Sequence, residues 1–285
     1  MRWAVSRGRR GAAWLAGAAL VAASLGSGCA VSHEPRLVAL PAAGTRPVSR
    51  LEMIFDDRIA VTTIASILQR DLGLPEFPVT FEIYPHEGAF ERALLDRGYD
   101  ATLARSTSKT MTGVGGYRRV LLNGRRLAAL EPAERVLLLA HELGHSLQYE
   151  LGGGQRGTSD QWLREGFADW VAIRVLERLN VTTLAAMRKQ REREVAAAGR
   201  ARFVPFADLV TFPQWVRAGE RGGTAPYAQA FLAADLLIER HGLATLLDYF
   251  RRFARVQDRE GNFTAAFGEP PAGVEEALRA RLFRR

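Results

Sequence analysis

Cysteine is almost absent from this sequence of 285 residues, which contains only Cys29. No intramolecular disulfide can form, so the fold must rely on its hydrophobic core and on any metal ion it binds. Basic runs interleaved with aromatic residues are also missing, and four of the eight net positive charges come from Arg2, Arg7, Arg9 and Arg10. The charge therefore gives no support for nucleic-acid binding. A hydrophobic fraction of 47% with 25% charged residues indicates a globular protein with a substantial core.

The N-terminal residues 1–28 predict an export signal, because a basic stretch ending at Arg10 leads into an uncharged apolar run. Cys29 follows small residues and resembles a bacterial lipoprotein processing site, which implies that Cys29 carries a lipid. Leu25 stands one position further from the cysteine than in the usual pattern, so cleavage after Ala30 and an uncleaved anchor stay as alternatives. All three alternatives place the protein outside the cytoplasm, facing the periplasm or cell exterior. A lipid on Cys29 or an uncleaved anchor would also attach it to a membrane. The polar residues 29–50 predict a linker.

The remaining chain divides into two parts of one α+β domain. Residues 51–130 predict a helix that ends at Gly73, a strand in FPVTFEIYP, a short helix in GAFERALLDRG and a strand in GGYRRVLLNG. Residues 131–285 are predicted to be mainly helical, with an exposed charged helix around MRKQREREV.

The sequence HELGH, from His141 to His145, carries the strongest chemical signal. Imidazoles four residues apart on a helix lie one turn apart, so both can bind one tetrahedral Zn²⁺. Glu142 lies beside such an ion, where it can act as a general base toward a water molecule. The surrounding stretch is apolar almost all round, and burying these groups there is costly unless a metal or partners compensate them. Two buried, hydrogen-bonded histidines without a metal are the alternative.

A second helix is predicted in QWLREGFADWVAIRVLERL, and it places Glu165 and Asp169 one turn apart on the same face. Glu165 supplies a third candidate ligand, although a solvated helix charge has the same sequence signature; its apolar neighbours favour an inward orientation. Asp169 can hydrogen-bond the far nitrogen of a liganding histidine, and we expect it to fix the ring of His141.

HELGH followed by WLREGFADW resembles the gluzincin metallopeptidases, which pair His-Glu-x-x-His with a glutamate on a second helix. The resemblance implies one zinc ion bound by His141, His145 and Glu165, with Glu142 as base and Asp169 as hydrogen-bond partner of a ligand. The metzincin pattern does not fit, because it needs glycine and histidine where this chain has Gln148 and Leu151.

The segment GGTAPYAQAFLAADLLIERHGLATLLDYFRRFA resembles the closing segment of bacterial peptidase MA-like domains in the same superfamily. That resemblance implies that Tyr227 donates a hydrogen bond to the oxyanion formed at the scissile carbonyl. A tyrosine packed on an apolar helix is the alternative.

The sequence therefore predicts an exported zinc metallopeptidase with a zincin-like α+β fold, in which the edge strand of a small N-terminal sheet borders the cleft. Its partner is a peptide or protein substrate. Aminopeptidase relatives carry Gly-x-Met-Glu-Asn near this strand, whereas this chain has the acid-free stretch GVGGY at 113–117, which favours endopeptidase action. A non-catalytic cell-envelope binding lipoprotein and a zinc hydrolase acting on a non-peptide amide are the alternatives.

Overall fold

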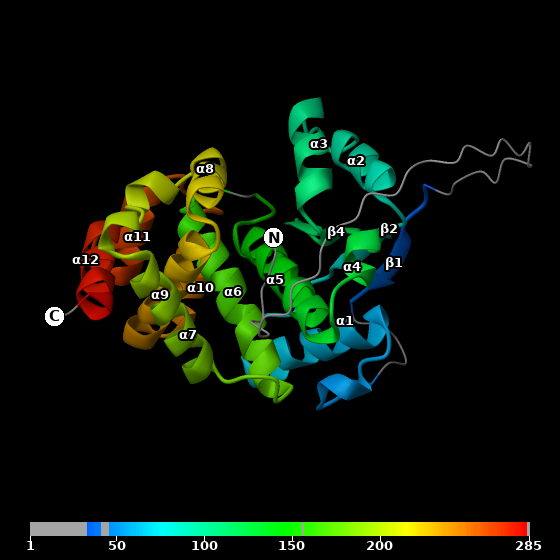
Figure 1. Ribbon diagram of the computed structural model, residues 1–285, viewed down its shortest axis with the longest axis horizontal. Helices are drawn as coiled ribbons and strands as arrows, with labels where there is room; N and C mark the ends of the chain where they lie inside the picture. Colours follow the sequence, from blue (N-terminus) through cyan, green and yellow to red (C-terminus); the bar gives the residue numbers. More distant parts are fainter. Residues whose placement is uncertain (1–32, 41–45, 156, 284–285) are drawn as a thin grey trace, which may run out of the picture.

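The computed structural model describes residues 33–40, 46–155 and 157–283, which form an α+β fold with a small sheet and a mainly helical remainder (Figure 1). The predicted signal segment and Cys29 lie outside these residues. Within the described ranges, no helix combines the length and the apolar character needed to cross a membrane.

The sheet has four strands in the order β1-β2-β4-β3. Their bounds are β1 Arg36–Ala39, β2 Thr80–Tyr84, β3 Gly113–Gly116 and β4 Arg119–Asn123. Strands β2 and β4 run parallel, while β1 and β3 pair antiparallel with them and form the two edges.

Two predictions about this sheet need correction. The predicted linker 29–50 contains β1, which pairs with β2 and buries Val38. Four residues are too few for a strand pattern to emerge from a polar stretch. The single strand predicted in GGYRRVLLNG is a hairpin, in which Tyr117 and Arg118 form the turn between β3 and β4 and Arg118 has a φ of 55°. The edge strand is therefore the glycine-rich β3, and the apolar β4 is interior.

Helices surround the sheet on both faces (Figure 1). In the N-terminal part they are α1 Asp57–Ser66, continued by a π-helical turn at Ile67–Asp71, α2 Glu87–Leu95, α3 Ala101–Thr110 and α4 Gly124–Ala128. Helices α2 and α3 form a projecting pair with its own small apolar cluster against the sheet, which includes Phe90 and Leu94. Helix α3 was not predicted, because its sequence ATLARSTSKT is mostly polar.

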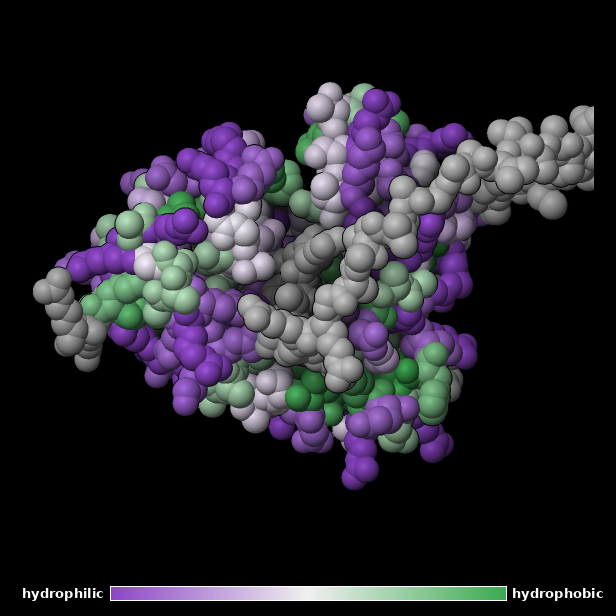
Figure 2. Space-filling view, viewed as in Figure 1, coloured by the Kyte–Doolittle hydropathy of each residue, from purple (hydrophilic) through white to green (hydrophobic). Residues whose placement is uncertain are grey.

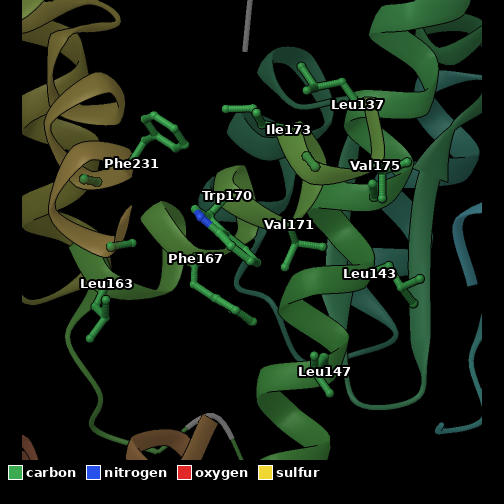
Figure 3. Close-up of a cluster of buried hydrophobic side chains, with 14 of the residues drawn as sticks. Leu137, Leu143, Leu147, Leu163, Phe167, Trp170, Val171, Ile173, Val175 and Phe231 are labelled. Atoms are coloured by element: carbon green, nitrogen blue, oxygen red, sulfur yellow. The ribbon is translucent and has the colours of Figure 1, made fainter. Parts of the chain in front are cut away.

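Three long helices form the centre of the helical part: α5 Pro132–Leu151, α6 Gln161–Arg178 and α9 Ala225–His241. Helix α6 packs between the other two, and its apolar side chains meet those of α5 and α9 in one core (Figure 3). Around them lie α7 Leu184–Ala198, which is the predicted charged helix, α8 Phe212–Gly222, α10 Leu243–Arg252, α11 Arg259–Phe267 and α12 Pro271–Leu282. Short 3₁₀ turns lie at Leu51–Met53, Arg200–Arg202 and Phe206–Leu209.

Two glycines allow close approaches between these helices. A Cβ added to Gly144 of α5 would lie 3.0 Å from the Cα of Ala168 on α6. A Cβ added to Gly166 of α6 would lie only 2.1 Å from the carbonyl oxygen of Ala230 on α9. The three helices therefore pack with their backbones nearly in contact, beside the predicted ligands.

Candidate metal centre

His141 and His145 lie on successive turns of α5, and their rings meet edge to face with centroids 4.7 Å apart. Their Nε2 atoms are 3.1 Å apart. The carboxylate of Glu165, from α6, faces both rings: Oε2 lies 3.5 Å from Nε2 of His141, and Oε1 lies 3.6 Å from Nε2 of His145. The structure thus brings the three predicted ligands together as a group that could hold a metal ion.

Each member of the group has a second polar partner that orients it. Asp169, one turn beyond Glu165, lies 2.7 Å from Nδ1 of His141, as the sequence predicted. Nδ1 of His145 lies 3.2 Å from Oε1 of Gln148. Gln161 donates from Nε2 to Oε1 of Glu165 at 2.7 Å. Neither glutamine contact was predicted, because a glutamine near a ligand belongs to no sequence motif.

The donor atoms suit a divalent cation. Asp169 and Gln148 both accept from the Nδ1 atoms, so the Nε2 atoms of the two rings face each other and Glu165, and a cation bound there would replace the second ring proton of His141. Atoms that bind a tetrahedral zinc at about 2.0–2.1 Å lie roughly 3.3 Å apart, close to the observed 3.1, 3.5 and 3.6 Å. Nitrogen and carboxylate donors of this kind suit zinc and several other transition metals.

Glu142 lies beside this group and faces the edge strand. The backbone N–H of Gly115 in β3 donates to its Oε2 at 2.6 Å. Burial raises the pKa of Glu142 to about 7, helped by the nearby Glu165, while the Gly115 N–H and the positive charge of His141 oppose the rise. A carboxylate with such a pKa can accept and return a proton near neutral pH.

Burial and mutual contacts shift the pKa values of the three candidate ligands. Burial opposes protonation of His141, but hydrogen bonds to Asp169 and Glu165 outweigh it and raise its pKa. Burial lowers the pKa of His145 to about 3, so this ring is neutral. For Glu165, burial works in the other direction, but the neighbouring rings and Arg164 prevail and hold its pKa at about 2. The carboxylate is therefore ionised and ready to bind a cation.

A cleft of about 490 Å³ opens over these residues. Its floor is α5, with His141, Glu142 and His145 exposed to the cavity, and its walls come from α3 and β3 on one side and from α8 and α9 on the other. In the space-filling view a notch separates the ends of α3 and α8 at the top of the molecule (Figure 2). Outside the metal group the lining is mixed, with apolar and aromatic side chains such as Leu103, Met111 and Trp215 beside threonines and a few charged residues.

Tyr227 lines the same cleft from the first turn of α9, packed edge to face against Trp215 with ring centroids 4.6 Å apart. Burial and the negative charge of Glu165 raise the pKa of its hydroxyl, which stays protonated and able to donate. Tyr227 therefore lies in the cleft with a hydrogen available, as an oxyanion donor requires.

The edge strand that borders the cleft is β3, whose direct contact with α5 was not predicted. Its glycines allow it to lie directly on α5: a Cβ on Gly115 would be 2.5 Å from the carbonyl oxygen of Glu142 and 2.7 Å from Cβ of His145. Arg118, in the turn after β3, holds the hairpin to the end of α5 through two hydrogen bonds of 3.0 Å to Glu150.

Comparisons of the chain with protein-family models, with curated proteins and with solved structures find no match. The functional conclusion therefore depends on the site itself.

Proposed function

We propose that the chain is a zinc-dependent metallopeptidase of the gluzincin type, in which His141, His145 and Glu165 hold the metal. The observation that carries the proposal is their convergence on the floor of a cleft, with the carboxylate of Glu142 beside them. A site built only to stabilise a fold is closed by a fourth protein ligand, whereas a catalytic site keeps one position open. Among the described residues, no fourth histidine, cysteine or acid joins the group.

Bound zinc supplies a Lewis acid that polarises the scissile carbonyl and lowers the pKa of a water molecule. Glu142 takes a proton from the attacking water and passes it to the leaving amine, for which a pKa of about 7 is suitable. Tyr227 donates its hydroxyl hydrogen to the developing oxyanion. Asp169 holds the ring of His141 in the tautomer that presents Nε2 to the metal.

We propose that the substrate is a peptide or protein bound in extended form along β3. Strand β3 is an edge of the sheet and lines the cleft, so those of its backbone groups that do not pair with β4 or with Glu142 can pair with a substrate backbone. Of the described acids that line the cleft, Glu142 and Glu165 belong to the metal site and Asp100 caps α3 by accepting from the N–H of Leu103. None is placed for a free α-amine, which favours endopeptidase over aminopeptidase action.

Export and attachment to a membrane through Cys29 are also part of the proposal and rest on the N-terminal sequence alone. Radiolabelled fatty acid should label the wild-type chain expressed in a bacterium, and Cys29→Ser should remove the label. Label retained by Cys29→Ser would exclude lipidation at this position.

The central experiment combines metal analysis with digestion of a peptide library. Purified protein should contain one zinc per chain and cleave library peptides, and a chelator should stop cleavage. Glu142→Gln should keep the zinc and lose turnover by at least about 10²-fold, because proton transfer by the base is removed. Glu52→Gln, at an exposed residue outside the cleft, is the matched control. Peptide binding without cleavage by the wild type would instead support the non-catalytic binding lipoprotein, and cleavage of non-peptide amides alone would support the other hydrolase.

A further inference from the structure

Gln148 connects the two helices that carry the candidate ligands. It lies on α5, one turn after His145, and only 2% of the residue is exposed to solvent. Its Oε1 lies 3.2 Å from Nδ1 of His145, and its Nε2 donates to the backbone carbonyl of Arg164 at 2.7 Å. Arg164 directly precedes Glu165 on α6. One buried side chain therefore contacts one ligand and the backbone next to another.

The orientation of the amide follows from its partners. A backbone carbonyl can only accept, so the NH₂ end of Gln148 must face Arg164 and the oxygen end must face His145. Because that oxygen can only accept, Nδ1 of His145 must carry the ring proton. The lone pair of His145 is then on Nε2, the atom that faces His141 and Glu165.

We propose that Gln148 is a positioning residue that fixes the metal-binding tautomer of His145 and the placement of Glu165 relative to it. The inference rests on the proposed function, since it concerns the same metal site. Gln148 does for His145 what Asp169 does for His141, but with a neutral group.

The neutral amide has a physical reason. Glu142, Glu165 and Asp169 already place three buried carboxyl groups around the site. A carboxylate at position 148 would add a fourth and would direct its lone pairs at the carbonyl oxygen of Arg164, where Gln148 now donates. An apolar residue would leave the Arg164 carbonyl without this donor and His145 without its acceptor. An amide accepts at one end and donates at the other, which matches both partners of Gln148.

The test compares Gln148→Met, which keeps the volume and removes both hydrogen bonds, with Gln148→Glu, which keeps the acceptor and removes the donor. Gln190→Met on the peripheral helix α7 is the control. Zinc affinity is measured on the full chain by competition with a chromophoric chelator, and the His145 tautomer of the metal-free protein by ¹⁵N chemical shifts. Circular dichroism checks that each variant is folded.

We expect wild-type His145 to be protonated on Nδ1. Gln148→Met should bind zinc about 10- to 100-fold more weakly, a loss typical of removing a partner of a ligand, and its His145 should lose the single tautomer. Gln148→Glu should retain the tautomer yet bind zinc more weakly, and Gln190→Met should match the wild type.

Two results would overturn the inference while leaving the metal site intact: an Nε2-protonated His145 in the wild type, or a folded Gln148→Met that binds zinc within twofold of the wild type. The wild-type tautomer decides the matter even if both variants fail to fold. Absence of zinc binding by the wild type would overturn the proposed function, and this inference with it.

Discussion

Replacing Gly115 by alanine should damage the site by moving β3 away from α5. The added Cβ would lie 2.5 Å from the carbonyl oxygen of Glu142 and 2.7 Å from Cβ of His145. Both atoms are fixed by the buried helix, so the strand must retreat. Restoring an ordinary contact of about 3.4 Å requires a shift of roughly 0.9 Å, and overpacking of this kind costs about 1–3 kcal/mol of folding free energy.

The same shift would stretch the hydrogen bond from the Gly115 N–H to Glu142, now 2.6 Å, to roughly 3.5 Å, where little of it is left. A misplacement of about 1 Å at a reacting centre can reduce the rate about 10²-fold. We therefore expect Gly115→Ala to lower turnover of library peptides about 10²-fold and to lower the unfolding midpoint by roughly 2–4 °C per kcal/mol lost.

Gly116→Ala is the matched control, because the neighbouring position in β3 offers ordinary space: the nearest atom to an added Cβ is the carbonyl oxygen of Arg119 at 3.6 Å. This variant should stay within about 0.5 kcal/mol of the wild type and keep its turnover. Turnover and thermal midpoint are measured on both variants and the wild type in parallel. If Gly115→Ala behaves like Gly116→Ala, then β3 does not lie against α5 as described, and its role in holding Glu142 is refuted.

Two further predictions concern the helices behind the site. Gly166→Ala should lower the free energy of unfolding, measured in urea, by about 3 kcal/mol or more, because its Cβ would lie 2.1 Å from the backbone oxygen of Ala230. Gly144→Ala should leave the free energy of unfolding nearly unchanged, because the gain of about 1 kcal/mol in helix propensity offsets its 3.0 Å contact. Equal costs would contradict the packing described for α6. Burial raises the pKa of Asp160, before α6, to about 6, against about 3.9 in an unfolded chain. The folded protein thus keeps a proton that the unfolded chain releases, so this group should lower the free energy of unfolding by up to about 3 kcal/mol as the pH rises from 4 to above 6. Asp160→Asn should remove this contribution. The same pH dependence in wild type and variant would exclude a raised pKa of Asp160.

The convergence of the ligands could be predicted from sequence because it depends mainly on local geometry. His141 and His145 are one helical turn apart, and Glu165 and Asp169 are one turn apart on the next helix. Once the two helices pack side by side, burying these groups costs free energy unless a cation or a hydrogen-bond network compensates them. The partner of His141 was predicted on the same basis, and the distance of 2.7 Å from Asp169 agrees.

Features that depend on tertiary contacts could not be predicted in this way. Glutamines are common on helices, so nothing in the sequence separates Gln148 and Gln161 from solvated side chains until both helices are placed. The strand β3 is three-quarters glycine, and glycine is depleted in strands, which hid it. Its glycines are explained only by the nearby backbone of α5, which leaves no space for a side chain at Gly115.

The small residues next to the ligands explain how a short side chain from α6 reaches the imidazoles of α5. Gly144 lies between the two histidines and next to Ala168, three residues after Glu165, so α5 and α6 approach each other closely beside the candidate metal group. On the far side of α6, Gly166 allows α9 to approach to backbone contact and to hold α6 against α5. A residue larger than alanine at 144 would push α6 outward, and the carboxylate, 3.5 and 3.6 Å from the two Nε2 atoms, would no longer reach both. The stretches HELGH and EGFAD therefore encode the candidate ligands and the helix spacing together, since Gly144 follows His141 by three residues, Gly166 follows Glu165 directly, and each allows a neighbouring helix to approach closely.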